Sequence, residues 1–173
     1  MAIKKIFYDR NYVQREVPIL LEILRMNKCS NIIRLVDKYL KSPDEKKPWP
    51  KVQGKEYLYI VTDYMPYTIC DLNISPQYYT KYDINAMASQ KNQVDLGLAK
   101  KQCLESIKQV MHGVFMGLRD LHGLGITHRD IKLSNILISN NKYPIQKVKI
   151  CDLGSSKKLK SDPNDESTQS LNY

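Results

Sequence analysis

The sequence has few of the features that mark membrane-spanning, secreted or disulfide-rich proteins. No apolar run approaches the roughly 18 residues that span a bilayer, and the first residues are too charged for a signal-peptide core. The four cysteines, Cys29, Cys70, Cys103 and Cys151, contain no C-x-x-C pair of the kind found in zinc and redox sites. Ala2 stands where N-myristoylation requires glycine. We expect a cytoplasmic protein, with nuclear residence left open, whose cysteines are reduced and mostly buried.

Glycine and proline are also scarce, with 7 and 8 among 173 residues, which argues against a disordered or fibrous chain. The 42% hydrophobic and 26% charged residues are typical of a globular domain, or of part of a larger one. A formal net charge of +9 permits attraction to several polyanions. The lysine doublets are dispersed and lack interleaved aromatic residues, so we expect no specific nucleic-acid binding and no membrane insertion.

The first part of the chain alternates between strand and helix patterns. A strand is predicted over the opening M-A-I-K-K-I-F, and a helix should begin near Arg15, because Pro18 is tolerated only in a first helical turn. Two further strands are predicted at Ile32–Tyr39 and Tyr57–Tyr64. The turn-rich stretch between them, from Lys41 to Glu56, is interpreted as an exposed hairpin insertion.

The second part centres on one long helix. Residues 75–94 are weakly patterned and are assigned to a helix and loops. A helix is predicted over Leu98–His122, with Gly123 and Gly125 at its C-terminal cap. Its expected apolar stripe consists of Leu104, Ile107, Met111, Val114, Phe115, Leu118 and Leu121.

The stretch after this helix alternates between short strands and polar segments. Strands are predicted at Ile136–Ile138 and Val148–Cys151, joined by a turn over Asn140–Pro144. From Ser155 onward the chain is polar, and we expect it to be mobile.

The most informative motif is H-R-D-I-K-L-S-N, which lies between the long helix and a short strand. Transfer of a phosphoryl group requires a carboxylate that orients the attacking hydroxyl and cations that hold the phosphates. Asp130 and Lys132 supply this pair, and Asn135 supplies an oxygen suited to Mg²⁺. A second metal-binding oxygen is predicted in Asp152 of the D-L-G sequence, directly after a strand.

A third element lies upstream, where A-I-K at the start of the chain provides Lys4 and the following helix provides Glu16. A lysine that binds ATP phosphates needs an anion to hold it in place, and Lys4 and Glu16 fit these roles. Each motif alone is weak, and solvated surface charges would be the ordinary interpretation. Together, in this order, they are typical of a phosphoryl-transfer site.

These motifs resemble those of protein kinases of the cyclin-dependent, MAP and glycogen synthase kinase group. The sequence is most similar to the glycogen synthase kinase-3 (shaggy-like) family, in the phrases A-I-K-K-I, N-I-I-R-L, V-T-D-Y-M-P and V-K-I-C-D-L-G-S-S-K-K-L. The resemblance implies an α+β, bilobal protein-kinase-like fold, with ATP and Mg²⁺ as cofactors and proteins as substrates. It implies that residues 1–65 belong to the small lobe and residues 66–173 to the first part of the large lobe.

The resemblance also implies roles for residues between the motifs. Asp63 and Met65 would offer backbone groups to adenine, with Thr62 at the gatekeeper position beside them. A regulatory spine would be formed by Leu20, Leu35, His128 and Leu153, for which ordinary core packing is the alternative.

A substrate that already carries a phosphate would be recognised through Arg15, Arg129 and Lys157, since arginine forks suit phosphate geometry. In other kinases the position of Arg129 instead binds a phosphorylated activation loop, and surface ion pairs are a further alternative. Tyr173 would be the activation-loop phosphosite.

The sequence departs from the family pattern in several places. Leu153 replaces the usual phenylalanine, Leu133 a proline and Ser134 a glutamine, but no reacting group is lost. No G-x-G-x-x-G loop precedes Lys4 and no residue follows Tyr173, so we expect the chain to be part of a catalytic domain and inactive alone. A truncated, non-catalytic kinase-like binding module is the alternative. Oligomeric state and protein substrate are left open.

Overall fold

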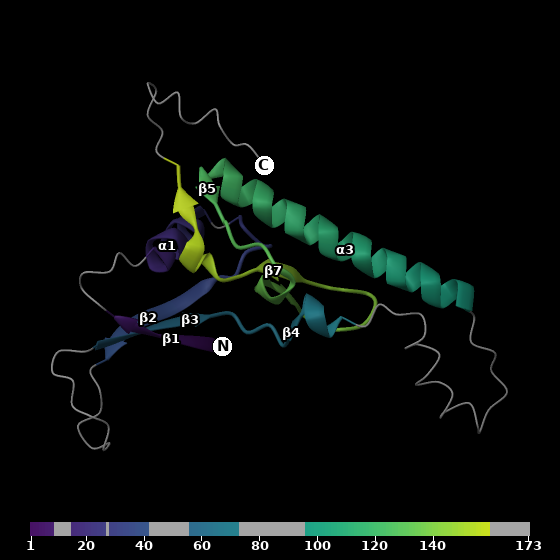
Figure 1. Cartoon of the computed structure of the whole chain (residues 1–173), viewed down its shortest axis with the longest axis horizontal. Coiled ribbons are helices and arrows are strands. Elements are labelled where there is room, and N and C mark those ends of the chain that lie inside the picture. Colours follow the sequence, from purple (N-terminus) through teal and green to yellow (C-terminus); the bar gives the residue numbers. More distant parts are fainter. Residues whose placement is uncertain (9–14, 27, 42–55, 73–95, 160–173) are drawn as a thin grey trace, which may run out of the picture.

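The computed structural model describes residues 1–8, 15–26, 28–41, 56–72 and 96–159 (Figure 1). These residues form antiparallel sheets and α-helices, as expected for an α+β fold. Residues 42–55 of the predicted hairpin insertion, the segment 75–94 and Tyr173 lie outside the described residues. In the described ranges, no helix combines the length and the apolar character needed to cross a bilayer.

The first sheet has the order β1-β3-β2, with β1 at Ala2–Tyr8, β3 at Glu56–Thr62 and β2 at Leu35–Lys41. All pairings are antiparallel, and Lys4 lies opposite Ile60. The opening strand is therefore confirmed, and the strand expected over Tyr57–Tyr64 ends two residues earlier, at Thr62.

The strand expected over Ile32–Tyr39 is corrected, because it begins only at Leu35. The preceding residues pair with a different strand: Ile33 N–H donates to Ile150 O, and Ile150 N–H donates to Asn31 O, both at 2.8 Å. Ile32 and Ile33 are buried there. This short segment thus joins the first sheet to the second.

Helix α1 spans Glu16–Met26. It therefore begins next to Arg15, as expected from the position of Pro18 in the first turn. Its apolar face, Val17, Ile19, Leu20 and Ile23, is buried in one core cluster with Leu58 and Ile60 of β3 and with Leu121, Ile126 and Leu153. Each such buried side chain stabilises the fold by roughly 1.5–3 kcal/mol. The core thus fixes α1 against the first sheet and against the segment that follows β7.

The second sheet has the order β4-β6-β7, with β4 at Tyr67–Thr68, β6 at Ile136–Ile138 and β7 at Val148–Ile150. Strand β4 was not predicted, since two residues carry no periodicity. The turn between β6 and β7 is as predicted: Asn140 Nδ2 donates to the carbonyl oxygens of Lys142 and Pro144 at 2.6 and 2.7 Å.

Helix α3, Leu96–Gly123, runs past β7 and ends beside β5 (Figure 1). Only part of its predicted apolar stripe is buried. Val114 and Leu121 face the core, whereas the exposed members are Leu104, Ile107, Met111 and Phe115. The periodicity correctly identified a helix, but the buried face is shifted toward Cys103, Val110 and Val114.

Two glycines of α3 allow the helix to approach β7 closely. A Cβ on Gly113 would lie 2.5 Å from Val148 Cβ, and one on Gly117 would lie 2.8 Å from both Asn31 O and Ile150 Cδ1. These distances are shorter than van der Waals contact, so no other residue fits without displacement of backbone. At these two glycines the backbone of α3 therefore lies directly against β7 and its neighbouring segment.

The stretch that was expected to be mobile from Ser155 includes regular structure in its described part, which ends at Leu159. A short 3-10 turn, η3 at Leu153–Ser155, is followed by β8 at Lys157–Lys158, and β8 pairs with β5 at Ile126–Thr127. Gly125, with φ of 67°, provides the left-handed residue after α3.

The cysteines are free, as expected, but they are not mostly buried. Cys103 is buried, Cys29 and Cys151 are half-buried, and Cys70 is exposed. The expectation treated each cysteine as a small hydrophobe, and Cys70 lies on an exposed turn, η1 at Ile69–Asp71, where no core covers it.

The contact of α3 with β7 yields a prediction for the full-length protein. Gly117→Ala should destabilise the fold by about 1–3 kcal/mol, because the new methyl group overpacks against backbone. Gly123→Ala is the control, since a Cβ there meets nothing within 4 Å and alanine favours a helix. Urea unfolding measures both. Equal stability of the two variants would contradict the close packing.

Candidate active site

Lys4 is the centre of a charged cluster formed by three distant parts of the chain. Its Nζ donates to Glu16 Oε2 at 2.9 Å and to Asp152 Oδ1 at 2.7 Å. Glu16 is almost fully buried at the start of α1, whereas the side chains of Lys4 and Asp152 are 44% and 41% exposed. The predicted pairing of Lys4 with Glu16 is therefore present, and the D-L-G aspartate, which was not predicted to contact Lys4, joins it.

The charges in this cluster shift the pKa values of their neighbours. The Lys4 ammonium holds the pKa of Asp152 below its usual value, against the opposing effect of burial. Partial burial lowers the pKa of Lys4, but the hydrogen bonds to Asp152 and Glu16 raise it by more. Burial raises the pKa of the adjacent Cys151 thiol to about 11, and the Asp152 charge adds to this. Lys4 and Asp152 are therefore charged at neutral pH, and Cys151 is a thiol.

Asp130, Lys132 and Asn135 form a second cluster. Lys132 Nζ and Asn135 Nδ2 both donate to Asp130 Oδ2, at 2.7 and 3.0 Å. The Lys132 ammonium, aided by the Asn135 amide, holds the pKa of Asp130 below its usual value, and Asp130 in turn raises the pKa of Lys132. Asp130 is thus a carboxylate, and no described residue hydrogen-bonds to its second oxygen.

His128 connects this cluster to Cys151, the residue before Asp152. The ring is 1% exposed, accepts the Asp130 N–H at Nδ1 (3.2 Å) and lies 2.9 Å from Cys151 O through Nε2. Because Nδ1 accepts, Nε2 must carry the proton that is donated to Cys151 O. Asn135 strengthens the connection, since its carbonyl oxygen accepts Cys151 N–H at 2.9 Å.

Both motifs contain a strained backbone residue. Within the described residues, the non-glycine residues with positive φ are Arg129 at 67° and Asp152 at 60°. Such conformations cost on the order of 1–3 kcal/mol each and persist only where surrounding contacts enforce them. Here the contact for Arg129 is a 2.7 Å hydrogen bond from its Nε to Ser155 O. The strain lies at the two residues that flank the proposed reacting centre.

The predicted phosphate-binding residues are partly brought together. Lys157 pairs with Thr127 across β8 and β5, which places it near Arg129, two residues further along. Arg15 lies exposed immediately before α1. Figure 1 shows α1 beside β8, and an ion pair from Lys158 to Glu22 joins the two elements.

The predicted hinge follows β3 directly. Asp63 O accepts a hydrogen bond from Thr62 Oγ1 at 3.3 Å and receives no other from the described residues. Within the described part of the chain, no residue hydrogen-bonds to the backbone of Met65, whose side chain packs against the core. Both residues could therefore offer backbone groups to a planar heterocycle.

The four predicted spine residues are all buried. Leu20, Leu35 and Leu153 belong to the same core cluster, at 1%, 4% and 0% exposure, and His128 is equally inaccessible. This burial agrees with a spine and equally with ordinary core packing.

The oxygen ligands suit a hard divalent cation. Asn135 uses its amide nitrogen toward Asp130, so its Oδ1 is left for a metal, and Asp152 contributes a carboxylate. In the ranges that the structure describes, no group of three or more His, Cys, Asp or Glu side chains forms a complete metal site. Mg²⁺ fits two such oxygens, because it usually takes its other ligands from phosphates and water.

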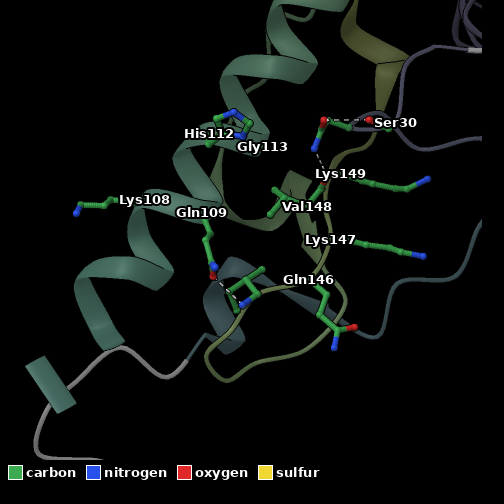
Figure 2. A pocket seen from close by; sticks show the side chains of 11 residues that line it. Ser30, Lys108, Gln109, His112, Gly113, Gln146, Lys147, Val148 and Lys149 are labelled. Atoms are coloured by element: carbon green, nitrogen blue, oxygen red, sulfur yellow. Dashed lines mark hydrogen bonds between the residues drawn. The ribbon is translucent and has the colours of Figure 1, made fainter. Parts of the chain in front are cut away.

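A separate cavity of about 650 Å³ lies between α3 and the turn before β7 (Figure 2). Residues around it include Gln109 and His112 of α3 and Lys147 and Lys149 near β7, whereas none of Lys4, Asp130 and Asp152 lines it. Figure 2 shows Lys147 and Lys149 extending in the same direction, with Val148 turned toward α3. This cavity takes no part in the charged clusters.

Two residues near the site were missed from the sequence. A Cβ on Gly154 would lie 3.3 Å from Asp152 Oδ1, so the glycine of D-L-G keeps space beside the charged cluster. Lys149 donates to Asp63 Oδ2 at 2.6 Å and so contacts the hinge. The first could have been found from the motif itself, whereas no local signal connects residues that are 86 positions apart.

Similarity to known proteins agrees with this geometry. The family model described as "Protein kinase domain" matches residues 1–173. The chain belongs to the protein kinase family.

Two curated relatives align with nearly all of the chain. The "Probable serine/threonine-protein kinase MRK1 homolog" of Encephalitozoon cuniculi is 33% identical over 160 residues, or 92% of this chain and 38% of the relative. "Protein kinase gsk31" of Schizosaccharomyces pombe is 30% identical over 165 residues, or 95% of this chain and 35% of the relative. The chain thus spans a little over a third of the length of these relatives.

The charged cluster predicts how Asp152 titrates. Lys4→Met should raise the pKa of Asp152, because the ammonium that stabilises the carboxylate is removed. Lys5→Met is the control, since Lys5 lies over the Tyr57 ring instead, 3.9 Å from its centroid. Carboxyl carbon NMR titration of the full-length protein measures the shift. Equal Asp152 pKa values in the two variants would contradict the pairing with Lys4.

Proposed function

We propose that the protein is a serine/threonine protein kinase that transfers the γ-phosphoryl group of Mg-ATP to hydroxyl groups of protein substrates. The observation that carries this proposal is the position of one ammonium, that of Lys4, between Glu16 and Asp152. A lysine fixed in this way is suited to hold ATP phosphates beside a metal-binding carboxylate. The similarity to curated protein kinases supports the same activity.

Each residue of the site has a proposed role in the reaction. Lys4 would neutralise phosphate oxygens, while Asn135 and Asp152 would hold Mg²⁺, which supplies charge stabilisation to the transferred group. Asp130 would orient the attacking hydroxyl and accept its proton at the oxygen that Lys132 and Asn135 leave unused. The adenine base would bind the backbone of Asp63 and Met65.

Within the kinases, we assign the protein to the glycogen synthase kinase-3-like group, whose substrates already carry a phosphate. Lys157 pairs with Thr127, two residues before Arg129, and Arg15 precedes the helix that is joined to β8. Three cations of this kind can hold one phosphate group through charge-assisted hydrogen bonds.

A non-catalytic binding module is the alternative. Such a protein would have no need of strained backbone at Arg129 and Asp152, or of an ionised Asp130 held by Lys132. These features favour catalysis. The two functions are separated by the variants below.

Asp130→Asn in the full-length protein should reduce kcat by about 10²–10⁴-fold, because the proton acceptor is lost while the side chain keeps its shape. Asp37→Asn on the exposed edge strand β2 is the control and should keep wild-type turnover. Phosphate transfer to a peptide and the thermal unfolding temperature are measured for both variants. Wild-type turnover in a folded Asp130→Asn variant would refute the mechanism.

Recognition of a phosphorylated substrate is tested with paired peptides. A peptide with phosphoserine a few residues C-terminal to the acceptor should be phosphorylated more efficiently than its unphosphorylated form. Arg15→Ala should remove most of this preference, on the order of 1.5–3 kcal/mol or roughly ten- to hundredfold in kcat/KM. Arg25→Ala, at the other end of α1, should preserve it. Equal rates for both peptides with the wild-type protein would remove the assignment to this group.

A further inference from the structure

Lys149 lies on β7, outside the motifs that define the proposed site, yet its side chain reaches the hinge. Its Nζ donates to Asp63 Oδ2 at 2.6 Å, and the two side chains are only 14% and 29% exposed. An ion pair shielded in this way is screened by salt much less than a surface pair. Loss of one partner would leave the other charge half-buried and unpaired.

Asp63 also contacts Arg34, through both its backbone and its carboxylate. Its N–H donates to Arg34 O at 3.1 Å, and Arg34 Nε lies 3.9 Å from Asp63 Oδ1. The backbone and the carboxylate of Asp63 are therefore both fixed, the first by Arg34 and the second mainly by Lys149.

The contacts close into a ring. Ile33 N–H donates to Ile150 O at 2.8 Å, and these two residues are the chain neighbours of Arg34 and Lys149. Starting at β7, the ring passes from Lys149 to Asp63, then to Arg34, and returns through Ile33 to Ile150. Two side chains contact the Asp63 carboxylate in this ring, Lys149 at 2.6 Å and Arg34 at 3.9 Å, and only the Lys149 contact is a hydrogen bond. Lys149 therefore provides a direct side-chain link between β7 and the hinge, in addition to the backbone hydrogen bonds.

We propose that Lys149 is a positioning residue for nucleotide binding. Its ammonium holds Asp63 so that the backbone from Asp63 to Met65 stays aligned with β7, which ends two residues before Asp152. The base-binding and metal-binding parts of the site are thereby kept at a fixed separation. This inference rests on the proposed function, because it assumes that the hinge binds adenine.

The structure supplies a matched control for this role. Lys147 is two residues from Lys149 and extends in the same direction (Figure 2), but it is exposed and forms no side-chain hydrogen bond or ion pair with a described residue. Substitution of either lysine removes one positive charge from the same part of the molecule. A difference between the two variants therefore reports the contact with Asp63 and excludes a general effect of charge.

The test uses the full-length protein with Lys149→Met, Lys147→Met, Asp63→Asn, the double variant Lys149→Met/Asp63→Asn, and Lys149→Arg. Binding of ADP is measured by calorimetry, and KM for ATP and kcat are measured with a peptide substrate. Lys149→Met and Asp63→Asn should each weaken ADP binding and raise KM by about tenfold, with kcat within about twofold of wild type. The double variant should be no weaker than either single variant, since one contact is lost in each case.

Two controls complete the experiment. Lys147→Met should leave ADP affinity unchanged, and Lys149→Arg should restore most of it, because the longer cation can still reach Asp63. A purely structural role would lower the unfolding temperature without this separation of KM from kcat.

Several results would overturn the proposal. Equal ADP affinity of Lys149→Met and Lys147→Met would do so, as would a loss confined to kcat. Should Lys149→Met fail to fold, Asp63→Asn decides, since it keeps the side-chain shape: unchanged ADP affinity in this variant overturns the proposal. A wild-type protein that binds no ADP would instead refute the proposed function.

Discussion

The site is organised by a single shared ammonium. Lys4 Nζ is bound at once by Glu16 from α1 and by Asp152 from the end of β7, so three segments that are far apart in sequence must adopt one relative position for both bonds to form. Glu16 is buried, and the ion pair with Lys4 offsets part of the cost of burying its charge. A displacement of α1 would break the ion pair between Glu16 and Lys4, and this energetic cost links the helix to Asp152 through the shared ammonium.

Other contacts fix the positions of the Asp130 loop and of the predicted hinge relative to this cluster. His128 and Asn135 both bond to the backbone of Cys151, so the loop that holds Asp130 is fastened to the residue before Asp152. On the other side of β7, Lys149 and the segment around Ile33 fasten the hinge. Strand β7 is short, but it is the element to which the proposed metal ligand, the proposed proton acceptor and the proposed base-binding segment are all connected.

The contacts among the proposed reacting residues could be anticipated from the sequence because most of them are local. Asp130, Lys132 and Asn135 lie within one loop, and Asp152 follows a strand, so motif and context suffice. The pairing of Lys4 with Glu16 was also predictable, because the family resemblance supplied the partner. The sequence could not reveal which strand Ile33 pairs with, since its apolar run is compatible with either sheet.

Long-range effects account for the other differences between expectation and structure. Helical periodicity showed that Phe115 and Val114 belong to an apolar stripe, but only the position of β7 determines that Val114 is buried and Phe115 exposed. The contact of Lys149 with Asp63 depends on two strands of different sheets meeting at their ends, and no spacing rule describes that. The close contact of Gly113 and Gly117 with their neighbours could likewise not be predicted, because glycine has no side chain that would contribute to an apolar pattern.

Those two glycines bear on how this protein can change during evolution. Most helix–strand contacts are made by side chains, and a larger residue on one element can be offset by a smaller residue on the other. The distance between the two elements can therefore change during evolution. At Gly113 and Gly117 the helix has no side chain left to shorten, and one of the neighbouring atoms is the Asn31 carbonyl oxygen, which no mutation can remove. The spacing between α3 and β7 is therefore closed to compensating substitution on the helix side, and sequence variation near the site must be absorbed elsewhere.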